Sequence, residues 1–318
     1  MNSLILRMIA GRVVVALVTL LIVAVVIFFA TALLPGDVAQ ILLGQAATPE
    51  AVAGLRTAMH LDQPAAVRFL LWLRNLATGD LGTSYVNNLP VSQLIGGRLV
   101  NSLKLAGITA AVSVPFALTI GITAAILRGT LVDRIISFFT IAVISVPEFM
   151  VATLAVIIFA VYLGWLPALS MTGDITTISG LLKAFAMPVI TLSFVICAQM
   201  IRMTRAAVIE TLSAPYVEMA LLKGASPSRI VLRHALPNAL GPIVNAVALS
   251  LSYLLGGVII VETIFNYPGI AKLMLDAVST RDLPLIQSCA MIFCLAYLLL
   301  ITIADLVAII SNPRLRKA

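Results

Sequence analysis

Charged residues are scarce in this chain. Asp, Glu, Lys and Arg make up 10% of its 318 residues, whereas a typical soluble domain contains about 25%. Hydrophobic residues make up 61%, and the mean hydropathy is +1.13. Because so few polar side chains cannot cover a water-exposed fold, a soluble domain is excluded and a protein of the lipid bilayer is predicted.

Histidine and cysteine are also rare, with two and three residues respectively. Cys197, Cys289 and Cys294 lie in apolar runs without the spacing of metal ligands, which predicts neither a disulfide framework nor a metal site. No nucleophile and base stand together in these runs, which disfavours an intramembrane enzyme and leaves no candidate catalytic residue. The sequence also lacks a G-x4-G-K-[ST] phosphate loop, so we expect no cofactor on this chain.

Long apolar runs, by contrast, are plentiful. A membrane-spanning helix needs about 20 mostly apolar residues, and six runs qualify. They cover residues 13–34, 105–127, 135–164, 184–201, 239–261 and 286–310. The runs are too long and too poor in alternating polar residues for barrel strands, so their backbone groups must be paired within helices. The sequence predicts an all-α membrane protein with six transmembrane helices.

The first run also resembles a secretory signal peptide, because the small residues Ala30, Thr31 and Ala32 follow a basic start. The apolar core of a signal peptide has about 7 to 15 residues. No charged residue occurs here between Val13 and Gly36, which is a longer stretch. We therefore expect a retained anchor helix.

Lys and Arg residues indicate the orientation of the spans. Twelve of the 20 lie near span ends on one side: Arg7, Arg12, Arg128, Arg134, Arg202, Arg205, Lys223, Arg229, Arg233, Arg314, Arg316 and Lys317. Four of the other eight lie in the long segment 37–98. The positive-inside rule is a weak guide there, because it applies to short loops. Both termini are therefore predicted to be cytoplasmic. The net charge of +7 is explained by this topology, without a nucleic acid partner.

The chain is predicted to divide into four parts. They are an anchor helix (1–34), an outer cap with short helices (35–98), a five-helix core (99–310) and a cytoplasmic tail (311–318). In the cap, Thr48 and Pro49 predict a helix start, and a second helix runs from Pro64 to near Gly79. A turn-rich connector then precedes a third short helix that leads into the second span.

A basic loop, residues 202–238, separates the fourth and fifth spans. Pro215 interrupts a helix there, Gly224 ends a short helix over 216–223, and Ser226 with Pro227 predicts a second short helix that ends at Pro237. Such a loop is consistent with amphipathic helices on lipid headgroups. A helix-turn-helix DNA reader has a similar outline, but the flanking spans argue against it.

The spacing of this loop is informative. Glu218, Ala220, Gly224, Leu236 and Pro237 fit E-x-A-x3-G-x11-L-P, which resembles the EAA loop of bacterial ABC-importer permeases. His234 and Met219 depart from the general pattern, although His at that position resembles the subfamily named next.

Seven sequence segments, in the same order along the chain, resemble signatures of the B-type permease of the dipeptide, oligopeptide and nickel ABC-importer family. These are TPEAVAGLRTAMHLDQP (48–64), GDLGTSY (79–85), LGWLP (163–167), RHALPNALGPIV (233–244), GGVIIVETIFNYPGIAKLMLDAV (256–278), RDLPLIQ (281–287) and NPRLR (312–316).

This resemblance implies a type I, MetI-like permease of the bacterial inner membrane with a periplasmic cap. It implies four kinds of partner: a homologous C-type permease, two ATP-binding subunits that hold ATP and Mg, a periplasmic or lipid-anchored solute-binding protein, and the bilayer. The solute would be a dipeptide or oligopeptide, with nickel, glutathione, haem or an opine-like compound as alternatives. The residues expected to couple to the ATPase are Tyr216, Glu218, Ala220, Lys223, Gly224, Ala225, Ser226, Pro227, Arg229 and His234.

Within the membrane, Glu148 is unusual because a charge at the bilayer centre costs about 2.5 to 3.5 kcal/mol on insertion scales. Pro147 before it predicts a kink. The candidate path residues are Ser145, Pro147, Glu148, Asn245 and Ser252. Glu148 could instead form a structural pair, or lie near water at a helix break. A rival function is an ion-coupled secondary transporter with a relay of Glu148 and Asp305, although Asp305 fits a local ion pair better.

The outer loop, residues 262–284, contains a turn followed by an amphipathic stretch, which is consistent with a plain surface or re-entrant helix. The family resemblance implies that the binding protein docks here. The candidate residues are Glu262, Asn266, Tyr267, Pro268, Lys272, Arg281 and Asp282.

Overall fold

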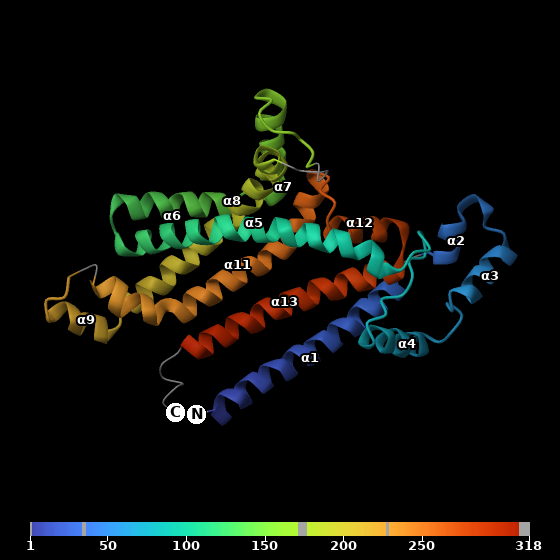
Figure 1. The fold of residues 1–318 in the computed structure, drawn as a ribbon, viewed down its shortest axis with the longest axis horizontal. Coiled ribbons are helices and arrows are strands. Elements are labelled where there is room, and N and C mark those ends of the chain that lie inside the picture. The colour runs from blue at the N-terminus through green and yellow to red at the C-terminus, as the bar shows by residue number, and fades with distance from the viewer. Residues whose placement is uncertain (1, 34–35, 171–176, 227–228, 312–318) are drawn as a thin grey trace. The chain divides into compact units, whose positions relative to one another are not determined.

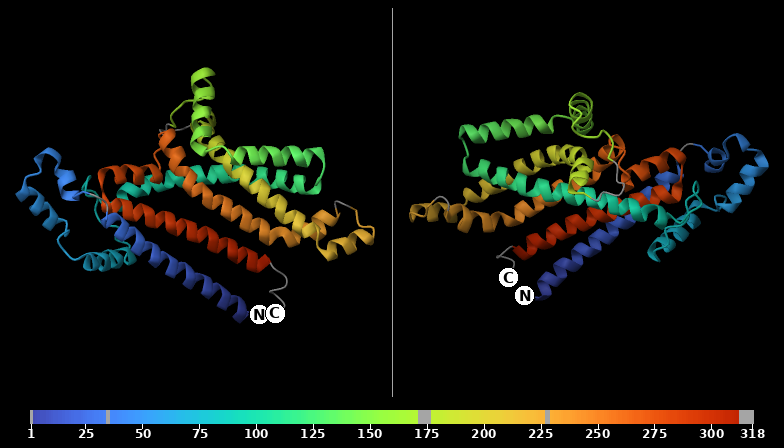
Figure 2. Two further views of the ribbon diagram at one scale, coloured as in Figure 1. Left: turned by 180° about the vertical axis from the view of Figure 1, so that it is seen from behind. Right: turned by 45° about the horizontal axis from the view of Figure 1, so that its top comes forward.

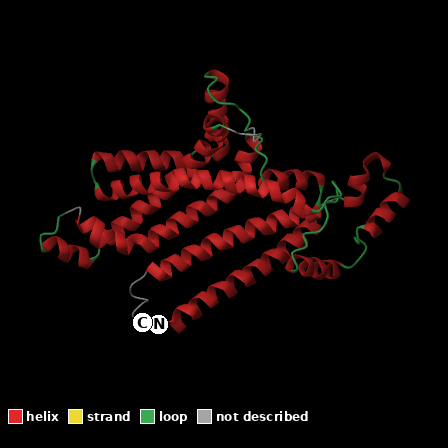
Figure 3. Ribbon diagram, in the orientation of Figure 1, coloured by secondary structure: helices red, strands yellow, loops and turns green. Residues whose placement is uncertain are grey.

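The computed structural model of the chain describes residues 2–33, 36–170, 177–226 and 229–311. The helices are α1 (Asn2–Ala32), α2 (Val38–Leu43), α3 (Pro49–Ala58), α4 (Ala65–Ala77), α5 (Val91–Ile126), α6 (Leu131–Ile144), α7 (Glu148–Ala155), α8 (Ile178–Leu212), α9 (Pro215–Leu222), α11 (Leu236–Ile264), α12 (Ile270–Thr280) and α13 (Leu283–Ser311) (Figure 1). Three shorter segments are the 3-10 helix η1 (Gly44–Ala46) and the π-helices η2 (Val156–Tyr162) and η3 (Ile230–Ala235). Over the described ranges no strand forms (Figure 3), which confirms the predicted all-α class.

Five of these helices are long and apolar enough to cross a membrane. The qualifying segments are Ile9–Ala32, Val91–Ile126, Leu182–Leu212, Leu236–Ile264 and Leu283–Val307. A sixth crossing is obtained if α6 and the α7–η2 segment count as one span. The prediction of six spans therefore holds, with one of them broken.

The break lies at Pro147. Proline has no N–H to donate to the preceding turn, and α6 ends with bonds from Ser145 N to Ile141 O (3.2 Å) and Val146 N to Val143 O (3.1 Å). α7 begins at Glu148 and is turned by 95° from α6, as Figure 2 shows from behind. The predicted kink is thus a full break, and the continuous span expected over 135–164 is corrected to two helices.

The described chain forms two compact units. The core unit contains residues 1–13, 103–267 and 297–318. In it α8 and α11 lie side by side, and α6 and α7 pack on α8. α5 approaches α8 closely at Gly121, where an added Cβ would lie 2.9 Å from the Ile201 carbonyl oxygen. This packing fixes the helices that carry the candidate site.

The cap unit contains residues 14–102 and 268–296. Phe28 of α1 packs edge-on against Phe69 of α4, with ring centroids 5.3 Å apart. The start of α5 packs on α12 and α13 through a buried cluster that includes Ile95, Ile270 and Ile286. The predicted outer cap is therefore joined within this unit to later parts of the chain.

The local signals of the cap are mostly confirmed. Thr48 caps α3 by accepting a bond from Ala51 N (3.2 Å), and Pro49 is the first residue of that helix. Gly79, with φ +83°, follows the end of α4. The expected separate third helix is wrong, because residues 91–126 form one helix and no proline interrupts its first 24 residues. The predicted domain boundary at residue 98 therefore lies inside α5.

Candidate functional site

The basic loop folds into what we call the knob, residues 213–235. Its first helix, α9, has Ala214 as N-cap and Pro215 at the first helical position, where the missing N–H costs nothing. Glu218 lies in the first turn, where the helix dipole favours a negative charge. Val217 is buried, and α9 packs on η3 and on α8.

Gly224 ends α9 in a Schellman motif. Its N–H donates to the Leu221 carbonyl oxygen (2.9 Å), and the Ala225 N–H donates to the Ala220 carbonyl oxygen (3.1 Å). The φ angle of Gly224 is +79°, a conformation that costs other residues about 1 to 2 kcal/mol. The prediction that this glycine terminates the helix is confirmed, and it reverses the chain at the tip of the knob.

The tip presents apolar side chains with charged neighbours. Leu222 is 74% exposed, and Tyr216, Met219 and Leu221 are also exposed. Glu218, Lys223 and Ser226 are exposed as well, whereas Ala220 and Ala225 are half-buried. A surface of this kind is suited to contact with another protein.

The second half of the knob differs from the prediction. η3 continues without a gap into α11, so the helix expected to end at Pro237 does not end there. Pro237 cannot donate to residue 233 and would press on that carbonyl group, and the preceding turn is widened to a π-helix. Arg229 and Arg233 are exposed. Pro227 and the His234 side chain lie outside the described residues.

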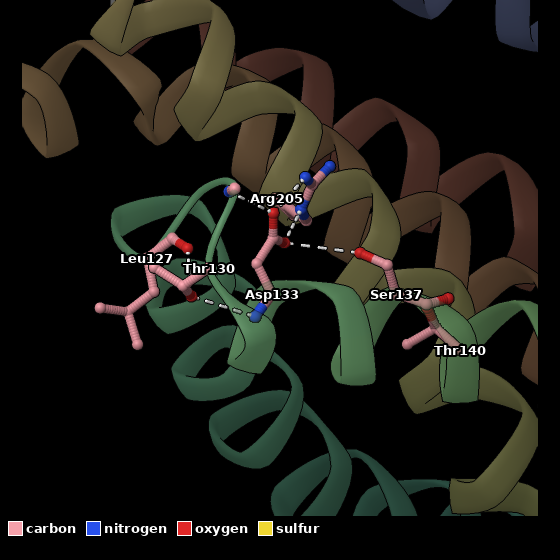
Figure 4. Close-up of polar contacts among 7 residues, drawn as sticks. Leu127, Thr130, Asp133, Ser137, Thr140 and Arg205 are labelled. Carbon is pink, nitrogen blue, oxygen red and sulfur yellow. Dashed lines mark hydrogen bonds and ion pairs between the residues drawn. The ribbon is translucent and has the colours of Figure 1, made fainter.

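Asp133 of α6 is held by Arg205 of α8, in the geometry of Figure 4. Arg205 donates from Nε to Oδ1 (2.6 Å) and from a terminal nitrogen to Oδ2 (2.9 Å). Gly129 N also donates to Oδ2 (2.9 Å), and Ser137 Oγ to Oδ1 (3.5 Å). Asp133 is buried, so this two-point ion pair ties the start of α6 to α8.

Sequence reasoning missed Asp133 and counted Arg205 only as a topology charge. A signal was present, because Thr130 and Asp133 have the spacing of a capping box. Thr130 Oγ1 accepts from Asp133 N at 3.5 Å, and the carboxylate reaches back to Gly129. The spacing could identify the helix start but not the distant arginine.

Glu148 borders a cavity of about 240 Å³ in the core unit. Gln199 of α8 and Ser250 and Tyr253 of α11 also line it. The carboxylate lies against Gly257 of α11, where a Cβ would lie 2.9 Å from Glu148 Oε2. The break at Pro147 thus places an acidic group at a cavity between helices.

Comparison with known proteins identifies the family and the fold. Residues 117–317 match the family described as binding-protein-dependent transport system inner membrane component, and residues 5–106 match the N-terminal region of such components. The chain belongs to this family. It is therefore a multi-pass protein of the inner membrane.

Relatives extend over nearly the whole chain. A probable peptide ABC transporter permease of Sinorhizobium fredii is 34% identical over 305 residues, which cover 96% of this chain and 97% of the relative. A glutathione transport system permease of Salmonella choleraesuis is 37% identical over 298 residues, covering 94% and 95%. A chain of the inward-facing MetNI methionine ABC transporter aligns with a TM-score of 0.53 at 16% identity, covering 69% of this chain and 97% of that one. The fold is that of type I ABC importer permeases.

Of the path residues expected in this transport component, Glu148 lines the cavity and the other four do not. Ser252 is buried and donates to Ala248 O (2.8 Å), so its predicted place in the path is corrected to a packing position. Ser145 is exposed and donates to Ile141 O (2.9 Å), and Pro147 forms the break. Asn245 is exposed on α11.

The outer-loop candidates in the core unit are Glu262, Asn266 and Tyr267. Asn266 is exposed, with φ +49°. Glu262 and Tyr267 are fully buried, and the Tyr267 ring packs edge-on against Phe185 at 5.7 Å. Burial and the nearby Glu262 carboxylate raise the pKa of Tyr267 above its usual range. The predicted docking role is corrected for these two side chains, because burial keeps them from a partner's surface.

The remaining candidates lie in the cap unit. Asp282 is buried, where Ser84 Oγ donates to one carboxylate oxygen and Tyr85 N donates to the other (3.1 Å). The prediction that Asp282 docks a partner is corrected, because its carboxylate is bonded to the connector that precedes α5. Pro268, Lys272 and Arg281 are partly exposed, and Arg281 has φ +60°. These three and Asn266 remain candidates for docking.

Proposed function

We propose that this chain is the permease subunit of an ATP-driven importer and forms half of a translocation path for dipeptides or oligopeptides. A periplasmic or lipid-anchored binding protein would deliver the solute, a homologous C-type permease would form the other half, and two subunits would bind ATP and Mg. The observation that carries the proposal is the knob between α8 and α11 in a chain of this transport family.

The knob is suited to transmit movement. Its exposed tip around Gly224 would enter a groove of an ATP-binding subunit. α9 follows α8 after two residues, and η3 is continuous with α11, so a push on the tip reaches both helices. The pair of Asp133 and Arg205 extends the connection to α6.

Peptides are the favoured solutes because both the Sinorhizobium and the Salmonella relatives are named for peptide substrates, glutathione being a tripeptide. Glutathione itself, nickel, haem and opine-like solutes are the alternatives. In such systems the binding protein makes most of the selection.

The rival function, an ion-coupled carrier, would need Glu148 and Asp305 to relay an ion. Asp305 instead pairs with Arg12 at 2.9 Å, which supports the local structural role expected for it. A carrier would also work without partner subunits, whereas the proposed permease depends on them.

The test is reconstitution of the four-subunit complex in proteoliposomes with the co-encoded binding protein and labelled dialanine. We expect uptake that requires ATP and the binding protein and is absent when either ATP-binding subunit is omitted. Uptake by this chain alone, driven by a proton or sodium gradient, would refute the proposal. Mass spectrometry of the ligand retained by the purified binding protein would identify the solute.

A further inference from the structure

The cavity beside the break between α6 and α7 brings polar groups from three helices together. Glu148 begins α7, Gln199 lies on α8, and Ser250 and Tyr253 lie on α11. Apolar side chains of α6 and α8 complete the wall. The volume of about 240 Å³ suits a small part of a solute such as one end of a peptide.

The negative charge of Glu148 has no ion-pair partner among the residues that the structure describes. The ion pairs found there involve Asp37, Asp62, Asp133 and Asp305. An uncompensated carboxylate at membrane depth is unfavourable, and such residues mark solute or ion pathways. A cation entering the cavity would compensate the charge.

The hydrogen-bonding groups that line the cavity favour a solute that donates hydrogen bonds. Ser250 is fully buried and its Oγ donates to Ala246 O (2.8 Å), so its hydroxyl hydrogen is not available to the cavity. The Gln199 side-chain oxygen already accepts from Arg202 (2.9 Å). Tyr253 is 64% exposed, and its phenol oxygen can accept as well. A group that carries both positive charge and several N–H donors matches this lining.

Gly257 makes room for the carboxylate. A Cβ there would lie 2.9 Å from Glu148 Oε2 and 3.3 Å from Leu192 Cδ2. At the neighbouring Gly256, a Cβ would meet no atom within 4 Å. The position of the charge therefore depends on one of two adjacent glycines.

We propose that this cavity is a subsite of the translocation path that binds the protonated amino end of a peptide, with Glu148 as its charge partner. Tyr253, which is exposed, would accept one of its remaining N–H bonds. The inference rests on the proposed permease function. A divalent metal fits less well, because the described residues contain no group of three His, Cys, Asp or Glu side chains that could hold one.

The experiment uses the reconstituted complex and compares dialanine with N-acetyl-dialanine, each at a concentration that saturates the binding protein. Glu148→Gln keeps the shape of the side chain and removes the charge. We expect it to slow dialanine uptake about tenfold, as for the loss of one charge-assisted hydrogen bond. N-acetyl-dialanine uptake and the stimulation of ATP hydrolysis by the loaded binding protein should be unchanged.

Dialanine uptake at the wild-type rate in Glu148→Gln, or an equal loss for both peptides, would overturn the inference. The proposed function is tested separately with the wild-type complex. If that complex shows no ATP-dependent uptake of dialanine, the proposed function fails.

Gly257→Ala provides a second variant that retains the carboxylate but displaces it. It should lower dialanine uptake selectively, while the matched Gly256→Ala should not. Equal behaviour of these two variants, with normal co-purification of all subunits, would also contradict the assignment.

Discussion

Asp133 shows how this apolar protein accommodates a buried charge. Its carboxylate accepts from Arg205, from the backbone of Gly129 and from Ser137. A buried charge without such bonds would be strongly unfavourable. The ion pair is therefore a fixed joint between α6 and α8 near the knob.

Arg205→Lys should weaken this joint. Lysine keeps the charge but cannot donate to both carboxylate oxygens in a planar fork. We expect a loss of about 1 to 2 kcal/mol in the free energy of unfolding in detergent and slower ATP-driven uptake. The control is Arg134→Lys, next to Asp133 on α6 and exposed, which should change stability by less than about 0.5 kcal/mol. Equal losses in both variants would argue against a special role of the pair.

Other single residues show the limit of pattern reasoning. The family resemblance implies a docking role in the outer loop for Glu262, Tyr267 and Asp282. All three are buried. Asp282 bonds to Ser84 and Tyr85, almost 200 residues earlier in the chain, and no local pattern encodes such a partner.

Helices and turns were more predictable. Thr48 with Pro49, and Gly224, act within one turn of the chain, so the start of α3 and the end of α9 follow from local chemistry. The break at Pro147 was also signalled, but the 95° turn depends on how α7 packs against α8 and α11. Likewise, η3 and α11 are continuous past Pro237 because the preceding turn is a π-helix. The presence of a proline does not by itself predict that π-helix.

Gly224→Asp should uncouple ATP hydrolysis from transport. The backbone strain in this variant is modest. Asp is one of the residues that adopt φ near +60°, and this conformation costs about 1 to 2 kcal/mol. The added carboxylate, however, would lie at the exposed tip of the knob. We expect normal membrane insertion but at least about tenfold slower uptake, equal to about 1.4 kcal/mol in the barrier.

Gly79→Asp is a matched control for this prediction. Gly79 has φ +83°, an added Cβ there would meet no atom within 4 Å, and it ends α4 with the same pair of bonds. It lies in the predicted periplasmic cap and should leave coupling intact. Wild-type uptake and ATPase association in Gly224→Asp would contradict the coupling assignment.

For the molecule as a whole, the charge distribution predicts a cytoplasmic knob and an outer cap. Single cysteines at Leu222 and Val86, both exposed, would test this in a background without Cys197, Cys289 and Cys294. In spheroplasts, an impermeant maleimide should label the Val86→Cys protein at once and the Leu222→Cys protein only after membrane disruption. The reverse order would invert the topology.

The sequence alone determined the membrane class, the six crossings and the positions of the knob and its glycine, because hydrophobic length, charge bias and turn chemistry are local properties. Tertiary structure decided which charges are buried, paired or open. Asp133 pairs with Arg205, and Asp282 accepts a hydrogen bond from Ser84. Glu148 lines a cavity and lies against Gly257. These outcomes depend on segments that are far apart in the chain and meet only when the helices pack together, because the cost of burying a polar group depends on the partners that the fold places beside it.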